Sequence, residues 1–244
     1  MSDFSVIIPA AGQSSRFQGH RRKKPFVDLD GRAIWLRTVE HFVNRDDVSE
    51  VVLVLAADDL AEFRERFRPN LAFLDLTIAE GGASRAESVQ NGLSALSKPC
   101  DFVAVHDAAR PLLTAEWISE LFAAARSKDA VLPGTAISST IKRVSAESVV
   151  KETVDRTNLF LAQTPQAFRR AILEESYASV DVTSDFTDEA SLVESLGHEV
   201  HIHPGWPMNI KITTNDDFDL AKLFIKALPK AAGLKSLHPF ADDR

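Results

Sequence analysis

Residues 4–24 read FSVIIPAAGQSSRFQGHRRKK, and this stretch decides how the rest of the chain is interpreted. The apolar run over residues 4–9 is followed directly by small residues at positions 10–12. Such a sequence is typical of a strand that opens into a tight loop, where exposed backbone N–H groups can point at an anion. We therefore expect a phosphate-binding loop after the first strand.

Two cations accompany this loop. Arg16 and Lys24 are separated along the chain, an arrangement suited to gripping a triphosphate and neutralising charge while one phosphoryl group is displaced. The stretch contains neither the G-x-x-x-x-G-K-[ST] nor the G-x-G-x-x-G signature of the common phosphate-binding loops. The alternatives are an ordinary loop with a solvated basic face and a basic patch that contacts nucleic acid.

The composition is that of an ordinary globular protein, with 45% hydrophobic and 26% charged residues. The 244 residues suffice for one large α/β domain or two small ones. We predict a single domain over residues 1–228 and a loose tail over 229–244. The 28 basic and 35 acidic residues give a net charge of -7, which argues against a general binder of nucleic acid or anionic membranes.

Cysteine content and hydropathy indicate the cellular compartment in which the protein is expected. Cys100 is the only cysteine, so no intrachain disulfide can form and nothing suggests a cysteine-based metal site. No run approaches the roughly 18 to 20 consecutive apolar residues of a membrane span, and the N-terminus lacks the pattern of a secretory signal. These features lead us to expect a cytoplasmic protein with no membrane partner.

Apolar runs and amphipathic stretches alternate through the first half of the chain. The run VVLVL at 51–55 is apolar throughout, as in a strand buried on both faces of a parallel sheet. The alternation predicts an α/β fold with a doubly wound, mostly parallel sheet. Strands are expected at 48–56, 76–79 and 102–105, and helices at about 33–43, 58–67, 85–96 and 117–127.

A glycine-containing loop follows the strand at 76–79, at the edge where open α/β sheets bind ligands. Ser84 is expected to cap the next helix, and Glu87 would complete a capping box. A plain helix cap after a glycine turn is one interpretation of this loop. The other is that the loop backbone and Ser88 contact a ligand.

The stretch HDAARP at 106–111 follows the strand at 102–105 and reaches the same edge of the sheet. Asp107 and Arg110 are candidates for contacting hydroxyls, a metal-bound phosphate or an anion. The alternative is an internal Asp–Arg pair that only pins the loop. His106 is expected to be a structural hydrogen-bonding residue.

The second half of the chain contains a predicted hairpin and several short elements. Residues 139–154 alternate with period 2 around a polar turn, which predicts a protruding β-hairpin arm over about 138–156. An isolated hairpin is marginal in water, so the arm is expected to pack on something else, such as a second subunit. Polar loops are expected at 155–158 and 163–168, helices at 171–178, from 187 and at 216–228, and strands at 199–204 and 208–214.

Five polar residues of these elements carry specific expectations. Thr187 and Asn215 are expected N-caps. His201 and His203 share one face of a strand, but no Cys or carboxylate follows at ligand spacing, which argues against zinc. Lys211 ends an apolar strand and would be costly to bury unpaired, so an anionic partner is expected.

Taken in order, the polar motifs resemble those of the 2-C-methyl-D-erythritol 4-phosphate cytidylyltransferases of the non-mevalonate isoprenoid pathway. Each motif alone is weak, but the ordered set, from about residue 6 to 223, is specific for this family and its close relatives. The motifs are Pro9-Ala10-Ala11-Gly12 with Arg16 and Lys24, Gly81-Gly82 with Arg85 and Ser88, HDAARP at 106–111, Thr140-Ile141-Lys142, Asp155-Arg156, Thr164-Pro165-Gln166, Thr187-Asp188-Glu189-Ala190, and Asn209-Ile210-Lys211-Ile212-Thr213.

The resemblance implies a Rossmann-like nucleotidyltransferase that converts CTP and 2-C-methyl-D-erythritol 4-phosphate into 4-diphosphocytidyl-2-C-methyl-D-erythritol and pyrophosphate. It implies Mg²⁺ held through the triphosphate, with no direct protein ligand, and a homodimer formed through the arm. It also implies three groups of site residues. These are catalytic cations Arg16, Lys24 and Lys211; CTP contacts Ala10, Ala11, Gly12, Gly82, Ser88 and Asp107; and acceptor contacts Asp107, Arg110, Thr140, Arg156, Thr164 and Lys211, with Arg156 reaching across to the other subunit.

Two residues depart from the family's pattern. Ser14 stands where the family usually has glycine, which questions the geometry of the first loop. Ser139 stands where it usually has aspartate, which removes a charge near the second substrate and questions acceptor choice. The alternatives are a cytidylyltransferase for another polyol phosphate, such as D-ribitol 5-phosphate, and a nucleotide-binding relative without turnover.

Overall fold

The computed structural model describes residues 3–12, 23–180 and 186–229 of the 244-residue chain. The strands of its main sheet are β1 (Phe4–Pro9), β4 (Val48–Leu55), β5 (Thr77–Glu80), β6 (Phe102–Val105), β7 (Ala130–Ala136), β10 (Phe160–Ala162), β11 (Gln166–Arg169) and β12 (His201–Pro204). Within the described residues they form one eight-stranded sheet in the order β10-β7-β11-β6-β1-β4-β5, with β12 pairing with β7 outside this path.

The centre of this sheet is parallel. β1 pairs with β4 on one side and with β6 on the other, so that Ile7 lies opposite both Val52 and Val105. β5 extends the parallel arrangement beyond β4. The apolar side chains of these central strands are buried on both faces of the sheet, as in other parallel sheets covered by helices. The predicted α/β fold with a mostly parallel, doubly wound sheet is confirmed.

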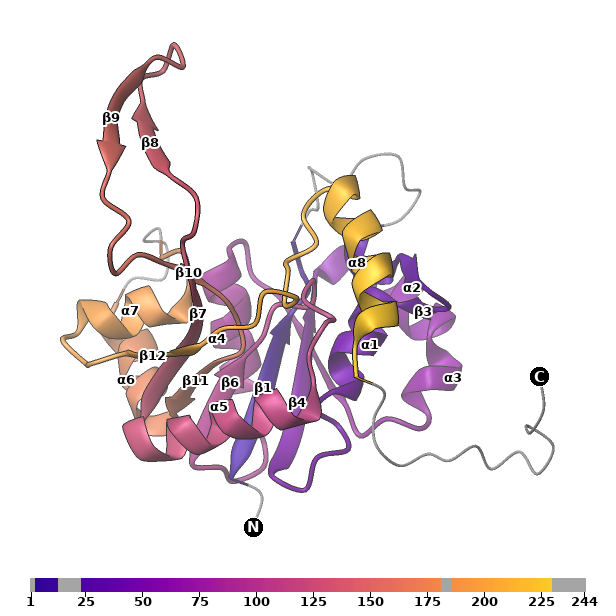
Figure 1. The fold of residues 1–244 in the computed structure, drawn as a ribbon. Helices are drawn as coiled ribbons and strands as arrows, with labels where there is room; N and C mark the ends of the chain where they lie inside the picture. The colour runs from indigo at the N-terminus through magenta and orange to yellow at the C-terminus, as the bar shows by residue number, and fades with distance from the viewer. Residues whose placement is uncertain (1–2, 13–22, 181–185, 230–244) are drawn as a thin grey trace.

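Helices cover both faces of the sheet (Figure 1). They are α1 (Ile34–Glu40), α2 (Leu60–Arg66), α3 (Arg68–Leu71), α4 (Arg85–Ser94), α5 (Ala115–Lys128), α6 (Arg170–Ser179), α7 (Glu189–Ser195) and α8 (Asn215–Ala227), with 3-10 turns η1 (Lys24–Phe26) and η2 (Ala57–Asp59). Val6 and Ile8 of β1 share a core cluster with residues of α1, α2 and α5. Ile7 instead shares a cluster with residues of α4, α6 and α7, because successive residues of a strand point to opposite faces.

β11 corrects the sequence interpretation, which expects residues 163–168 to form a polar loop. Gln166–Arg169 instead insert between β6 and β7, antiparallel to both, with Ala167 opposite Ala104 and Val131. Ala167 and Phe168 are fully buried. A four-residue strand flanked by polar residues is too short to carry a recognisable period-2 signal.

The segment 208–214 is a second correction, because it forms no strand. Its backbone instead makes single contacts, such as the Ile212 N–H donating to Ala109 O at 2.9 Å. Ile212 packs with α8 and with the short hairpin of β2 (Asp28–Leu29) and β3 (Arg32–Ala33). The alternating apolar residues of this segment thus reflect side chains that pack on the core, although its backbone does not pair with a strand of the sheet.

Two of the predicted helix caps differ from the observed ones by one residue. α7 is capped by Asp188, not Thr187, and α8 by Thr214, not Asn215. Ser84 caps α4 as predicted, accepting from the Glu87 N–H. The expected capping box is not formed there, because the Glu87 carboxylate accepts from the Ala83 N–H instead. Several Ser, Thr, Asp and Asn residues adjoin each helix start, and each of these types can cap.

The predicted hairpin is present as β8 (Ile141–Val144) and β9 (Val150–Val154), which pair antiparallel in a sheet of their own. Figure 1 shows it projecting away from the main sheet. We call residues 138–156 the arm. Of the predicted tail 229–244, residues 230–244 lie outside the described residues, and the single-domain boundary stays a prediction. No helix in the described part of the chain is both long and apolar enough to cross a bilayer.

Candidate active site

A cavity of about 520 Å³ opens at the carboxyl ends of β1, β4 and β6. This is the edge of an open α/β sheet where ligands bind, and β1 lies at the point where the strand order reverses. Its volume suits a nucleotide-sized ligand. The cavity is lined by Pro9, Ala10, Ala11, Gly12, Lys23, Lys24, Pro25, Ala56, Asp58, Gly82, Ala83, Ser84, Arg85, Ser88, Asp107, Ala108, Ala109, Lys211 and Thr213.

Most of the predicted nucleotide-site residues therefore share one hollow. Lys24 and Lys211, which come from opposite ends of the chain, both line it. Arg16 and Ser14 lie outside the described residues. The functional roles of all these residues stay predictions, but the six predicted CTP contacts lie together: Ala10, Ala11, Gly12, Gly82, Ser88 and Asp107.

Other predicted acceptor residues do not line the cavity. Thr140 and Arg156 lie on the arm, where both are exposed and Arg156 donates to the Ser138 carbonyl oxygen. Thr164 is buried below the cavity, next to Asp107. Arg110 is directed at Asp107 from within the same loop.

The loop between β5 and α4 is held in shape by a side chain from the first turns of α4. Ser88 Oγ accepts from the Gly82 N–H at 3.1 Å and donates to Ser84 O at 2.8 Å. A Cβ at Gly81 would lie 2.7 Å from the Cβ of Ala11, closer than two carbon atoms can approach. Glycine is therefore required where this loop meets the loop after β1, and Ser88 fixes the loop before any ligand arrives.

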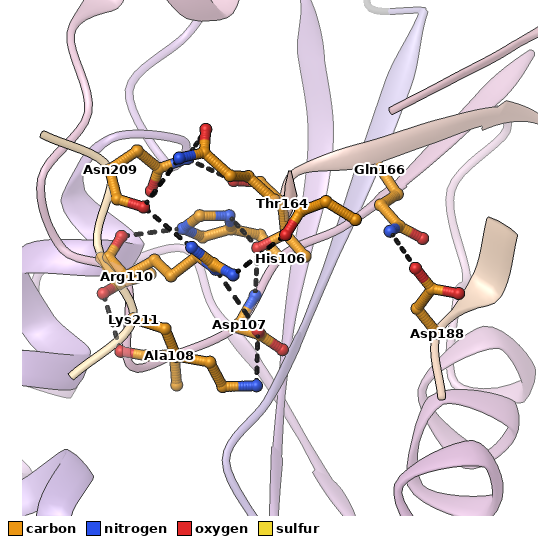
Figure 2. A network of polar contacts seen from close by, with 12 residues as sticks. His106, Asp107, Ala108, Arg110, Thr164, Gln166, Asp188, Asn209 and Lys211 are labelled. Atoms are coloured by element: carbon orange, nitrogen blue, oxygen red, sulfur yellow. Dashed lines mark hydrogen bonds and ion pairs between the residues drawn. The ribbon is translucent and has the colours of Figure 1, made fainter. Parts of the chain in front are cut away.

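Asp107 is the electrostatic centre of the site. Its carboxylate lies 2.8 Å from Lys211 Nζ, 3.4 Å from Arg85 Nη2 and 3.5 Å from Arg110 Nε. Burial alone would raise the pKa of Asp107, but Arg85, Lys211 and Arg110 outweigh it and hold that pKa well below its usual range. Asp107 is the anionic partner expected for Lys211, and it comes from within the chain (Figure 2).

A neutral histidine supports Asp107 from below. His106 is fully buried, and burial lowers its pKa to about 3. Because Nε2 lies 3.0 Å from Arg110 O, which only accepts, this nitrogen carries the proton, and Nδ1 accepts from the Thr164 hydroxyl at 3.0 Å. Thr164 Oγ1 in turn accepts from the Asp107 N–H at 3.0 Å. His106 thus has the structural role predicted for it.

Asn209 joins this network to the segment that carries Lys211 (Figure 2). It is fully buried; its side-chain Nδ2 donates to Thr164 O, and its carbonyl accepts from Arg110 Nη1, both at 2.8 Å. Sequence reasoning quoted Asn209 only as part of a motif. Asn209 lies two residues before Lys211 in the sequence, and this closeness to a predicted catalytic cation is the signal that could have identified Asn209.

Arg85 and Glu189 form a second pair that sequence reasoning assigned no role. Glu189 accepts from Nη1 and Nη2 of Arg85 at 2.7 and 3.0 Å. Burial alone would lower the pKa of Arg85, but Glu189 and Asp107 outweigh it and raise that pKa. An acidic residue in the first turn of a helix is already explained by a favourable interaction with the helix dipole. For this reason the sequence contained no sign that Glu189 also contacts the distant Arg85.

The described side chains are not arranged to coordinate a metal ion directly. Within residues 3–12, 23–180 and 186–229, no group of three or more His, Cys, Asp or Glu side chains is placed to hold a metal ion. Asp107 already faces its three cations. A divalent ion in this cavity would therefore need most of its ligands from a bound substrate, as Mg²⁺ commonly takes them from phosphates.

Chemically, the cavity offers cations and backbone N–H groups but no activated nucleophile among its described residues. The cations that line it are Lys23, Lys24, Arg85 and Lys211. His106 is buried, neutral and bonded at both ring nitrogens, so it cannot serve as a base. This arrangement suits reactions in which anionic groups must be brought together and developing negative charge stabilised.

Comparisons with known proteins agree with this geometry. The family model described as 2-C-methyl-D-erythritol 4-phosphate cytidylyltransferase (IspD) matches residues 4–227. A relative of that name from Syntrophus aciditrophicus is 35% identical over 224 residues, covering 91% of this chain and 95% of the relative. One of the same name from Symbiobacterium thermophilum is 38% identical over 224 residues, covering 91% and 92%.

A solved structure gives the same result. The crystal structure of 2-C-methyl-D-erythritol 4-phosphate cytidylyltransferase from Thermus thermophilus matches with a TM-score of 0.76 and 31% sequence identity. The match covers 92% of this chain and 99% of that chain. The chain belongs to the 2-C-methyl-D-erythritol 4-phosphate cytidylyltransferase family.

Proposed function

We propose that this chain transfers the cytidylyl group of CTP to 2-C-methyl-D-erythritol 4-phosphate, giving 4-diphosphocytidyl-2-C-methyl-D-erythritol and pyrophosphate. Family membership and the names of the relatives support this reaction. The single structural observation that carries it is the carboxylate of Asp107 beside the loop at 10–12, with Arg85, Arg110 and Lys211 around it.

The reaction is an in-line displacement at phosphorus. An oxygen of the acceptor phosphate attacks the α-phosphorus of CTP, a new P–O bond forms, and the bond to the β-phosphate oxygen breaks so that pyrophosphate leaves with that electron pair. The nucleophile is already an anion, so no strong base is needed. The work of the protein is to position two mutually repelling groups and stabilise the added charge.

Each cation has a proposed place in this reaction. Arg16 and Lys24 would contact the triphosphate, and Lys211 would bridge Asp107 and the acceptor phosphate; the cavity lined by Lys24 and Lys211 supports the last two roles. The loops with Ala10, Ala11, Gly12, Gly82 and Ser88 would hold CTP. Arg110 and Thr164 would act on the acceptor largely by holding Asp107 in place.

Mg²⁺ is proposed as the cofactor. When bound, it would neutralise the triphosphate and favour departure of pyrophosphate. The triphosphate would hold it, since Asp107 is engaged by cations of the chain. Cys100 is the only cysteine, so the chain has no intrachain disulfide. Proteins of reducing compartments commonly lack disulfides, and this supports a proposed cytoplasmic location.

A homodimer is proposed through the arm. Thr140 and Arg156 lie on the arm and outside the cavity of their own chain, which fits a role at the site of a second subunit. Apolar side chains are also exposed on the arm, such as Val149, and on β10, such as Phe160 and Leu161. Phe160 and Leu161 are neighbours on β10, and exposed apolar surface of this kind is typical of interaction sites.

A panel of acceptors tests the function. Pyrophosphate release would be measured with CTP and either 2-C-methyl-D-erythritol 4-phosphate or D-ribitol 5-phosphate, with and without Mg²⁺. We expect the highest kcat/KM with the methylerythritol phosphate and loss of turnover when a chelator removes the metal. Faster turnover with ribitol 5-phosphate would overturn the acceptor. Tight CTP binding without pyrophosphate release from either acceptor would overturn the enzymatic function.

A further inference from the structure

A buried acidic residue at the start of α7 has no part in the chemistry described above. Glu189 is the first residue of α7 and is only 1% exposed. Besides the two hydrogen bonds from Arg85, its carboxylate accepts one from Tyr177 Oη at 3.3 Å. A buried ion pair is a costly way to stabilise a fold, because apolar side chains of similar volume often do so at least as well. This pair calls for a functional explanation.

The partner of Glu189 stands at the cavity. Arg85 is the first residue of α4, directly after the loop that contains Gly82 and Ser84, and it lines the cavity. Its Nη2 also lies 3.4 Å from Asp107 Oδ1. A single guanidinium therefore connects the β5–α4 loop, the end of β6 and the start of α7.

Glu189 is itself fixed to the main sheet. Gln166 of β11 donates to Asp188 Oδ2 at 2.8 Å, as Figure 2 shows, and accepts from the Ala190 N–H at 3.0 Å. Asp188 also caps α7 by accepting from the Ser191 N–H at 3.0 Å. The residues on both sides of Glu189 are thus held by one amide, so its carboxylate projects from a rigid support.

The charges around Asp107 show what Glu189 prevents. Within the part of the chain that the structure describes, the ion pairs of Arg85 are with Glu189 and Asp107. Without the charge of Glu189, Arg85 would move further onto Asp107 and compete with Lys211 and Arg110 for its oxygens. Because Arg85 is the first residue of α4, this movement would strain the start of α4 and the adjoining loop at 81–84 against the hydrogen bonds of Ser88 that hold it.

We propose that Glu189 is a positioning residue that holds Arg85 between the β5–α4 loop and Asp107, and thereby sets the placement of CTP. This inference rests on the proposed function, because it takes that loop as the nucleotide-binding one. It gives the Thr187–Ala190 motif a role beyond starting a helix.

The test is a double-mutant cycle with Glu189→Gln, Arg85→Gln and both together, assayed for pyrophosphate release. We expect each single variant to raise KM for CTP by about tenfold. KM for the methylerythritol phosphate should change by much less. The double variant should be no worse than Arg85→Gln alone, because Glu189 acts through Arg85. Glu174→Gln, which breaks the exposed Arg170–Glu174 pair on α6, is the matched control and should leave both KM values unchanged.

Equal rises in KM for both substrates, additive losses in the double variant, or a lower Tm without a kinetic change would each overturn the proposal. If Glu189→Gln does not fold, Arg85→Lys serves instead, since it keeps the charge but loses the two-pronged contact. CTP affinity measured by calorimetry distinguishes a failure of the proposed function from a failure of the positioning role of Glu189. Wild-type protein that binds CTP without turnover contradicts the proposed function, whereas unchanged CTP affinity in Glu189→Gln contradicts the positioning role.

Discussion

Lys211 Nζ lies 2.8 Å from Asp107 Oδ2, which places a cation from the segment before α8 against the end of β6. Lys211 is therefore oriented before any substrate binds. Since preorganised charge stabilises a transition state without reorganisation at the moment of reaction, this pair is the natural place to perturb the chemistry.

We expect Lys211→Met to lower kcat by about 10²- to 10³-fold while KM for CTP changes little, because the lost charge would act mainly on the transition state. Steady-state pyrophosphate release measures both constants. Lys222→Met, which breaks the exposed Lys222–Asp219 pair on α8, is the control. A fall in kcat no larger than that of the control would remove Lys211 from the proposed catalytic group.

His106 predicts how stability depends on pH. Burial lowers its pKa from 6.5 to about 3, so between these values the unfolded chain binds a proton that the folded chain does not. The free energy of unfolding should therefore fall as the pH is lowered through this window, by at most about 1.4 kcal/mol per pH unit from this residue. Asp107, whose pKa is held below its ordinary 3.8 in the folded chain, adds to this loss only in the acid part of the window, at about pH 4 and below, where the unfolded carboxylate takes up a proton.

Urea unfolding at about pH 7 and about pH 5 checks this linkage. We expect His106→Gln to be less stable than the wild type at both values but to lose less stability between them. Some slope should remain, since burial also lowers the pKa of His41. An unchanged slope in His106→Gln would show that the proton uptake on unfolding belongs to other groups.

Gly92 of α4 predicts a packing limit. A Cβ at this position would lie 2.6 Å from Ile7 Cγ2 and 3.0 Å from Val54 Cγ2. Alanine would gain about 1 kcal/mol in helix propensity, but overpacking of a core costs about 1–3 kcal/mol. We expect Gly92→Ala to lower Tm, whereas Ser94→Ala on the exposed side of the same helix should not. A Gly92→Ala protein more stable than the wild type would contradict the close approach of α4 to β1.

The arm predicts a concentration-dependent dimer. Light scattering should give the wild type twice the chain mass of 26.8 kDa. Deletion of the turn at 145–148 should lower this mass at the same protein concentration, and Leu161→Glu should do so by placing a charge on exposed apolar surface. An unchanged mass in both variants would exclude the arm and β10 as the interface.

The sequence predicted the central sheet well because its strands are continuous apolar runs. Val51 to Leu55 and Phe102 to Val105 are buried on both faces, so composition alone identifies them. β11 could not be found in this way, because its pairing is decided by strands that lie far away in the sequence. Local propensity does not contain that information.

For the site, the sequence predicted which residues lie together, while the roles of these residues stay predictions. Gly82, Asp107 and Lys211 were singled out by motif, and they line one cavity. The partnership of Arg85 with Glu189 was missed, because the two residues meet only after α4 and α7 have packed on the sheet. Charged residues near a helix start fit local explanations, and only tertiary structure separates these from a long-range contact.

The insertion of β11 between β6 and β7 also affects how the protein is made. While the chain is being translated, β1, β4, β5 and β6 leave the ribosome first, and β6 then has an unpaired edge beside the loop that carries Asp107. Thr164, β11 and Lys211 emerge only later. The nascent chain can therefore pair its central parallel strands early, but the polar centre around Asp107 is completed only after residues 164–211 have been synthesised.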